Sequence, residues 1–270
     1  TGYQLSHNIT SCTNSGYIQS TSASYNDYVG GITGYSKLPV NDSINTSSGA
    51  VNGGSYVAGI VGRLLAGVSI SGNSNAAAIT ATGSYVGGIV GLMIGGSLTG
   101  AYAGGTSYYT NTGAILGGNY VGGIIGEYSL SSSANTMIRS VCNIGAVRLT
   151  SAAGTAVGGI IGRITASGSA TGILYVGDPS SLSTNYYVSN SGNINTVTPT
   201  TSATGVGGIV GYIAEGTGTT NKVSVYIGGG SDTKRVLNSG VTANNANSGL
   251  FHGVVHARNG PHARWLRALM

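Results

Sequence analysis

The sequence predicts an all-β protein, specifically a single-stranded parallel β-solenoid (β-helix) of about seven coils, with one coil for each repeat. Three observations lead to this prediction. A short apolar string recurs along the chain, an Asn-x-Gly motif recurs between its copies, and the composition combines 49 glycines with a charged fraction of only 6%. Charged residues usually make up about a quarter of a globular chain, so this surface must be solvated mainly by hydroxyls and amides.

The apolar string has six clear copies, spaced by 28, 29, 35, 36 and 49 residues. Periods of this length are typical of solenoids and propellers, and the longer spacings indicate insertions. The degenerate string SGLFHG, residues 248–253, is expected to be a seventh copy. The clear copies are VGGITG at Val29, VAGIVG at Val57, VGGIVG at Val86, VGGIIG at Val121, VGGIIG at Val157 and VGGIVG at Val206.

The second recurring element is Asn-x-Gly followed by a β-branched residue. Because Asn and Gly both tolerate positive φ, the motif predicts a turn that leads into a strand. The copies begin at Asn14, Asn111, Asn143 and Asn190, with a shortened one at Asn238.

Two short strands per unit and the lack of helical periodicity exclude helical solenoids, and a propeller blade needs a longer unit. In a β-solenoid each position of the unit stacks on its own copy one coil away. Val and Ile stack well, whereas like charges repel. Glycine at the third and sixth positions of the string is expected to leave room for the opposing wall of a narrow core.

Strand alternation leaves one ambiguity in the string. With a period of two, Val86 and Val90 face one way while Tyr85 and Ile89 face the other, so both faces are apolar. Either a bulge at the Gly-Gly pair returns Ile89 to the core, or the second face is covered by another part of the chain or by another chain.

The recurring Gly-Gly-Ile-Val-Gly, the Ser- and Asn-rich strand after it and the Asn-x-Gly turn resemble the GLUG motif family over about Ile9 to Gly253. GLUG repeats occur in large surface-exposed and adhesin-like proteins. The resemblance implies a β-solenoid in an extracellular or cell-surface setting, and it brings no catalytic residues. The irregular stretch between Gly162 and Val206 is expected to hold an inserted loop.

Charge and composition also restrict the partners. From Leu64 to Gly126 no charged residue or histidine occurs, yet Gly, Ser, Asn and Thr interrupt the stretch, so no membrane span is expected. The net charge of +5 rests partly on the last residues of the chain, so nucleic acid is not an expected partner. Three acceptor patterns for N-glycosylation, at Asn8, Asn41 and Asn45, favour export.

Little in the sequence points to catalysis, and no metal or other cofactor is expected. The six acidic residues are scattered, and Asp27 and Asp42, which flank the first copy, are expected to be solvated turn residues. Cys12 and Cys142 lie about four coils apart, too far for a disulfide between them. They are expected to be small buried side chains, with a bridge to another molecule as the alternative.

Tyrosine is the candidate contact residue. Four tyrosines precede successive strings and are expected to stack into a ladder, which either is structural or, if exposed, forms a flat apolar strip for sugar rings or another copy. Two tyrosine pairs in loops are further candidates for ligand contacts. The ladder is Tyr28, Tyr56, Tyr85 and Tyr120, and the pairs are Tyr108 with Tyr109 and Tyr186 with Tyr187.

The expected organisation is a solenoid over residues 1–253 and a basic tail over residues 254–270, which is a cap, an assembly arm or foreign sequence. The predicted function is that of a non-enzymatic extracellular structural protein that self-associates into a surface fibre, layer or adhesive stalk. Its expected partners are copies of itself. The alternative is an adhesin module that binds glycans or a host surface through the Tyr-rich loops.

Overall fold

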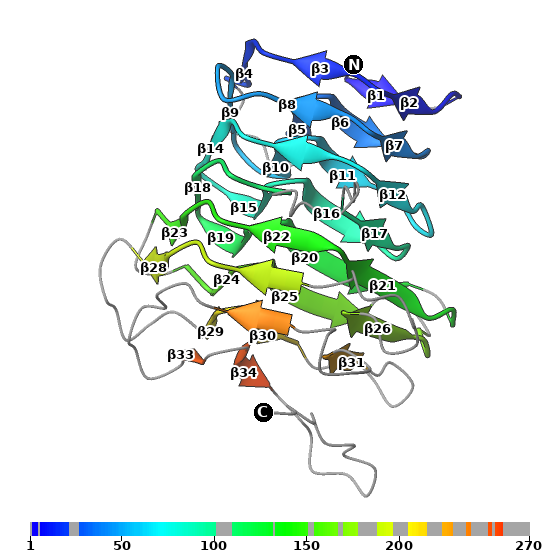
Figure 1. Cartoon of the computed structure of the whole chain (residues 1–270), viewed down its shortest axis with the longest axis vertical. Helices are drawn as coiled ribbons and strands as arrows, with labels where there is room; N and C mark the ends of the chain where they lie inside the picture. Colours follow the sequence, from blue (N-terminus) through cyan, green and yellow to red (C-terminus); the bar gives the residue numbers. More distant parts are fainter. Residues whose placement is uncertain are drawn as a thin grey trace, which may run out of the picture.

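The computed structural model describes most of the chain up to residue 255. Within this part all regular structure is β-strand, and every pairing between strands is parallel (Figure 1). The described residues are 2–4, 6–21, 27–100, 110–131, 133–150, 154–166, 170–177, 188–196, 205–214, 223–228, 236–238, 248–249 and 252–255.

The two largest sheets contain the apolar strings. The eight-stranded sheet is formed by β1 (Tyr3–Gln4), β6 (Thr33–Ser36), β11 (Val61–Leu64), β16 (Val90–Ile94), β20 (Ile125–Leu130), β25 (Ile161–Ala166), β30 (Val210–Ile213) and β34 (His252–Val255). The seven-stranded sheet is formed by β5 (Val29–Gly30), β10 (Val57–Ala58), β15 (Ser84–Gly87), β19 (Asn119–Gly122), β24 (Ala156–Gly158), β29 (Gly205–Gly207) and β33 (Ser248–Gly249).

The segments between the strings form the remaining sheets. The six-stranded sheet holds β4 (Tyr17–Gln19), β9 (Ala50–Gly53), β14 (Ala78–Ala81), β18 (Ile115–Gly117), β23 (Val147–Leu149) and β28 (Ile194–Thr196). The five-stranded sheet holds β12 (Ile70–Ser71), β17 (Leu98–Thr99), β21 (Thr136–Arg139), β26 (Ile173–Val176) and β31 (Ser224–Ile227). The smaller sheets pair β2 (Ile9–Thr10) with β7 (Val40–Asn41), join β3 (Thr13–Asn14), β8 (Ile44–Asn45) and β13 (Ser74–Asn75), and join β22 (Val141–Asn143), β27 (Val188–Asn190) and β32 (Val236–Asn238).

Each strand pairs with its equivalent in the neighbouring repeat, as the sequence predicts. Val57 is in register with Val29 on one side and with Val86 on the other, and the column continues through Val121, Val157 and Val206. The degenerate copy obeys the same register, because Ser248 pairs with Val206 and His252 with Val210. Successive repeats lie one below another along the long axis in Figure 1. This all-β architecture of stacked parallel sheets fits a β-solenoid.

The ambiguity over the second apolar face is resolved by a corner within each string. β15 ends at Gly87 and β16 begins at Val90, with a bend between them. Val86 packs in one apolar cluster, whereas Ile89 and Val90 both pack in another, and all three are fully buried. Of the two alternatives, a bulge at the Gly-Gly pair or a covered second face, the second describes the structure, because this chain itself buries Ile89 in a separate cluster and a second chain is not needed.

A ladder of asparagines separates these two clusters. Each asparagine donates from Nδ2 to Oδ1 of the next, over distances of 2.7–2.9 Å. Glycine at the third position of the string faces this ladder, because a Cβ on Gly88 would lie 2.7 Å from Asn111 Cγ. The opposing wall that the third-position glycine was expected to accommodate is thus the ladder itself. Its members are Asn14, Asn45, Asn75, Asn111, Asn143 and Asn190.

The expectation of positive φ in the Asn-x-Gly motif was wrong. Neither the asparagines nor Gly16, Gly113, Gly145 and Gly192 have positive φ. The asparagine instead closes a corner, as Asn111 Nδ2 does by donating to Gly113 O at 2.9 Å. Glycine is needed for space, because a Cβ on Gly113 would lie 1.9 Å from the carbonyl oxygen of Ala77 in the preceding repeat.

The predicted domain boundary falls inside a strand. β34 spans His252–Val255 and pairs with β30, so the solenoid strand runs past the expected boundary between residues 253 and 254. The rest of the tail, from residue 256, lies outside the described residues. Within the described ranges, no helical segment has the length and apolar character needed to traverse a bilayer.

Candidate functional site

The four predicted ladder tyrosines stack on one another along the solenoid. The ring centroids of Tyr28 and Tyr56 lie 5.0 Å apart, those of Tyr56 and Tyr85 4.5 Å apart, and those of Tyr85 and Tyr120 5.3 Å apart. Tyr35 extends the row, at 5.6 Å from Tyr28. The prediction that these tyrosines form an aromatic ladder is confirmed.

An unusual backbone conformation holds three of these rings. Tyr56, Tyr85 and Tyr120 have φ values of 54°, 66° and 50°, which is the left-handed region. A bulky side chain in this region carries strain of roughly 1–3 kcal/mol. The repeat of this conformation at equivalent positions shows that the backbone path into each string fixes it, and the stacked rings are a compensating contact.

One pair of the ladder stacks face to face, and the other pairs are tilted by 51–56°. The planes of Tyr56 and Tyr85 differ by only 6° at a centroid separation of 4.5 Å, so each ring covers a face of the other. All four ladder tyrosines are partly buried. Tilted rings do not form a flat apolar strip, and the inner faces of Tyr56 and Tyr85 are covered, so the structural interpretation of the ladder is favoured over a flat strip for sugar rings.

A column of residues that includes Arg63, Glu127 and Arg163 lies beside the tyrosine ladder, and it was not predicted from the sequence. It consists of the residue that follows the sixth position of each string, and its members are in register across the eight-stranded sheet. The signal was present in the alignment of the copies, where this position alternates between aromatic, charged and apolar residues. The column runs through Tyr35, Arg63, Leu92, Glu127, Arg163 and Tyr212.

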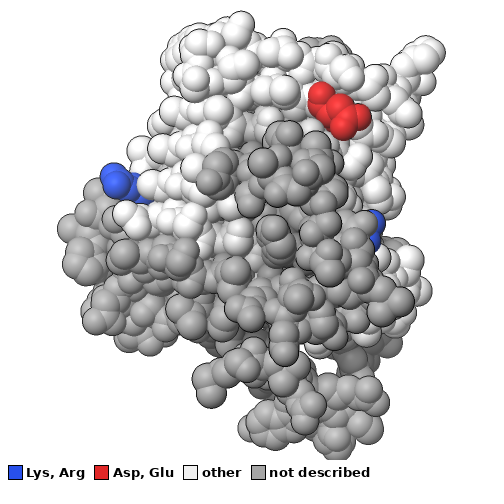
Figure 2. Space-filling view, in the orientation of Figure 1, with Lys and Arg blue, Asp and Glu red and all other residues white. Residues whose placement is uncertain are grey.

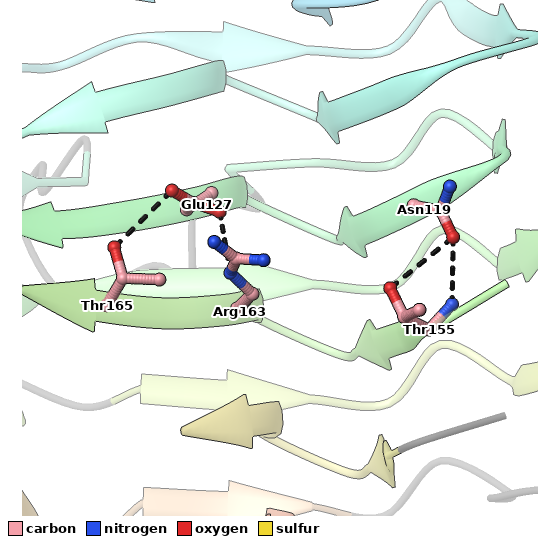
Figure 3. A network of polar contacts seen from close by, with 5 residues as sticks. All are labelled: Asn119, Glu127, Thr155, Arg163 and Thr165. Carbon is pink, nitrogen blue, oxygen red and sulfur yellow. Dashed lines mark hydrogen bonds and ion pairs between the residues drawn. The ribbon is translucent and has the colours of Figure 1, made fainter. Parts of the chain in front are cut away.

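Arg163 and Glu127 form an internal ion pair in this column (Figure 3). Arg163 Nε lies 2.8 Å from Glu127 Oε2, and the Arg163 guanidinium lies 4.0 Å from the centroid of the Tyr120 ring. Thr165 Oγ1 donates to Glu127 Oε1 at 3.4 Å. Burial raises the pKa of the Glu127 carboxyl, and the neighbouring Arg163 and Thr165 oppose this shift without cancelling it.

Figure 3 also shows a second polar contact, between Asn119 of one repeat and Thr155 of the next. Asn119 Oδ1 accepts hydrogen bonds from the backbone N–H of Thr155 at 2.9 Å and from its hydroxyl at 3.3 Å. Both contacts join one repeat to the next, as the Arg163–Glu127 pair does. The polar groups near the ladder therefore serve to hold adjacent repeats together.

Arg63 occupies the position equivalent to Arg163 in an earlier repeat. Its guanidinium carbon lies 5.4 Å from the centroid of the Tyr28 ring and 5.9 Å from that of Tyr35. Arg63 Nη1 donates to Tyr28 Oη at 2.7 Å.

Burial raises the pKa of the Tyr85 hydroxyl to about 12, and the nearby negative charge of Glu127 makes the next largest contribution to this increase.

The remaining candidate residues do not gather at one point. Asp42 is exposed at a left-handed turn with φ of 51°, and Asp27 accepts a hydrogen bond from the Ser20 hydroxyl at 2.5 Å. Within the described ranges, no group of three or more His, Cys, Asp or Glu residues could hold a metal ion. The arrangement offers tyrosine hydroxyls and one arginine for binding.

The structure corrects two of the smaller expectations. Cys12 and Cys142 are free, as predicted, but Cys12 is exposed and Cys142 only partly buried. Asn45 is fully buried with its amide engaged on both sides in the ladder, so it is not available as a glycosylation acceptor in the folded chain. Asn8, by contrast, is exposed.

The loop tyrosines, Tyr108, Tyr109, Tyr186 and Tyr187, lie outside the described residues. The adhesin alternative, which rests on those loops, therefore stays a prediction. Comparison of the chain with protein-family models, with curated proteins and with solved structures found no match. The resemblance to the GLUG motif family stays a prediction as well.

Proposed function

We propose that this chain is a non-enzymatic extracellular structural protein that self-associates into a surface fibre, layer or adhesive stalk. In this proposal its strands form one continuous solenoid of about seven coils, with one coil for each copy of the string. The mechanism is mechanical. Backbone pairing between repeats gives stiffness along the axis, and uncharged outer faces give contacts between copies.

The observation that carries the proposal is the unbroken stacking of the interior. The asparagine ladder links six repeats through direct side-chain hydrogen bonds, and the adjacent valine column keeps one register over the same repeats. Asparagine ladders and stacked apolar side chains also stabilise fibrous cross-β assemblies. A body built in this way resists bending and extension, which suits a stalk or fibre.

The outer surface supports association between copies. Figure 2 shows only isolated charges among the described residues of the face that it draws. Charged side chains normally prevent sheets from meeting at their edges, and few are present here. Among the residues that the structure describes, four large hydrophobic side chains are exposed, which adds apolar area for contact: Tyr3, Tyr17, Ile44 and Ile144.

Size in solution tests the proposal. We expect sedimentation and light scattering on the purified chain to show species larger than a monomer, which grow with protein concentration, and electron microscopy to show fibres or sheets. Replacement of two exposed residues, in the variant Ile44→Lys with Ile144→Lys, should shift the distribution toward the monomer, because like charges would then meet in the contact. A chain that stays strictly monomeric at high concentration would contradict self-association.

A further inference from the structure

Two arginines occupy the same position of the repeat, and only one is neutralised. Arg63 and Arg163 both follow the last glycine of a string, and each places its guanidinium over the ladder tyrosine of the preceding repeat. Arg163 has Glu127 as its neighbour in the column, whereas Arg63 lies between Tyr35 and Leu92. Among the described residues no carboxylate forms an ion pair with Arg63.

Arg63 also keeps hydrogen-bonding capacity. A guanidinium has five N–H donors in a planar fork that matches a carboxylate. Arg63 Nη1 donates to the Tyr28 hydroxyl, and Arg63 Nε is buried without a hydrogen-bond partner. Since the Arg63 side chain as a whole is only partly buried, its N–H donors other than the buried Nε can meet a ligand at the surface.

The tyrosine edges next to Arg63 form a regular row of polar groups. Successive ring centroids are 4.5–5.3 Å apart and each ring is partly exposed, so one tyrosine per repeat reaches the surface. This spacing is close to the length of one pyranose residue in an extended polysaccharide. A tyrosine hydroxyl both donates and accepts, so the partly exposed row can bind sugar hydroxyls.

We propose that this row, formed by Tyr28, Tyr56, Tyr85 and Arg63 and here called the tyrosine rim, binds a polysaccharide that carries carboxylate groups. A uronate chain lies along the rim, and Arg63 holds one of its carboxylates. Among the described residues along this row, Arg63 is a cation without a carboxylate partner, whereas Arg163 is neutralised by Glu127, and one free cation beside several hydroxyls suits a polymer with many hydroxyls. It does not suit a nucleic acid, whose binding needs several Lys or Arg residues on successive phosphates.

The test compares two ligands with the same backbone, hexagalacturonate and its fully methyl-esterified form, by calorimetric titration of the full chain. We expect the acid to bind at least about tenfold more tightly than the ester, since the ester removes the charged hydrogen bond to Arg63. The variant Arg63→Gln should weaken binding of the acid by at least about tenfold and leave binding of the ester unchanged. The variant Arg63→Lys, which keeps the charge, should retain part of the preference.

Two further variants test whether the rim itself binds the polymer. Tyr56→Phe removes the hydroxyl but keeps the ring in the ladder, and it should weaken binding of both ligands. Arg148→Gln removes an exposed positive charge on β23, in a different sheet, and should change neither. Far-ultraviolet circular dichroism identifies any variant that does not fold.

The proposal is overturned if neither ligand binds, if acid and ester bind equally, or if Arg63→Gln binds the acid as the unchanged chain does. An equal loss in Arg148→Gln would also overturn it, because the attraction would then be a general effect of positive charge. The inference does not depend on self-association, since binding is measured per chain.

Discussion

Removal of one central rung of the asparagine ladder should destabilise the fold far more than removal of its terminal rung. Asn111 is fully buried, and its side chain takes part in three hydrogen bonds. Its Nδ2 donates to Gly113 O at 2.9 Å and to Asn143 Oδ1 at 2.7 Å, while its Oδ1 accepts from Asn75 Nδ2 at 2.8 Å. Asn111→Ala removes all three and leaves their partners buried.

The magnitude follows from these contacts. Each intramolecular hydrogen bond contributes about 1 kcal/mol net, and a buried polar group left without a partner costs about 1–3 kcal/mol. Water can replace few of these contacts at a fully buried site, so the expected loss is about 3–5 kcal/mol in the free energy of unfolding. For a chain of this size, this corresponds to a fall in Tm on the order of 10 °C.

The matched control is Asn14→Ala at the N-terminal end of the ladder. Asn14 is only partly buried, so water can satisfy the exposed Gly16 groups that it leaves, and only one buried group, Asn45 Oδ1, loses its partner. We expect a loss of about 1 kcal/mol. Thermal melts of both variants, followed by circular dichroism, measure the difference. Equal Tm values for Asn111→Ala and Asn14→Ala would refute the reasoning, because burial and the number of bonds would then not set the cost.

Three further predictions concern other positions. Gly113→Ala should cost at least about 3 kcal/mol in the free energy of unfolding or prevent folding, because its Cβ would lie 1.9 Å from a carbonyl oxygen. In the control Gly16→Ala, at the equivalent position, the nearest atom to the Cβ would be 3.6 Å away, so the Tm should change little. Equal Tm values for the two variants would contradict this reasoning. The pKa of Glu127 is raised in the folded chain, so the free energy of unfolding should fall as the pH rises from the ordinary glutamate pKa through the raised one. Glu127→Gln should lack this fall, and parallel stability curves for the two proteins would contradict the buried-carboxyl argument. Since burial raises the pKa of Tyr85 to about 12, ultraviolet titration of Tyr85→Phe should lose one late-ionising phenol, and an unchanged titration curve would argue against it.

The register of the repeat could be predicted because identical side chains stack on one another. Val57, Val86 and Val121 were expected in one column from their place in the string, and they form it. The same logic placed the degenerate copy correctly, although Ser248 and His252 do not resemble Val206 and Val210, with which they pair in register. Alignment of copies therefore carried the information, and no knowledge of long-range packing was needed.

The asparagine ladder was missed because the motif was taken to be Asn-x-Gly. Asn45 and Asn75 are followed two residues later by Ser and Ala, so they did not match, and Asn45 was interpreted as a glycosylation acceptor. The ladder needs only the amide at each rung. Positive φ is not the reason for glycine in this motif. Glycine is required at Gly113, Gly145 and Gly192 because a Cβ there would collide with a carbonyl oxygen of the preceding repeat.

Part of the candidate site could also be predicted from the sequence, and part could not. The stacking of the ladder tyrosines could be predicted, because each one directly precedes a copy of the string: Tyr28, Tyr56, Tyr85 and Tyr120. The left-handed backbone at three of these tyrosines could not be predicted, because a bulky residue such as tyrosine carries no sequence signal for positive φ. Glu127 and Arg163 directly follow two identical strings, VGGIIG at Val121 and at Val157, so the alignment already places them in register, and only the ion pair between their side chains required the structure.

By itself, the sequence determined which residues stack along the axis, because each repeat presents the same side chain at the same position and a parallel register brings like residues together. Only the tertiary structure decided which residues meet across the interior. Those contacts, such as Gly88 against Asn111, depend on the angle of each corner. The corner angles result from packing among all the sheets at once, and no single repeat encodes them.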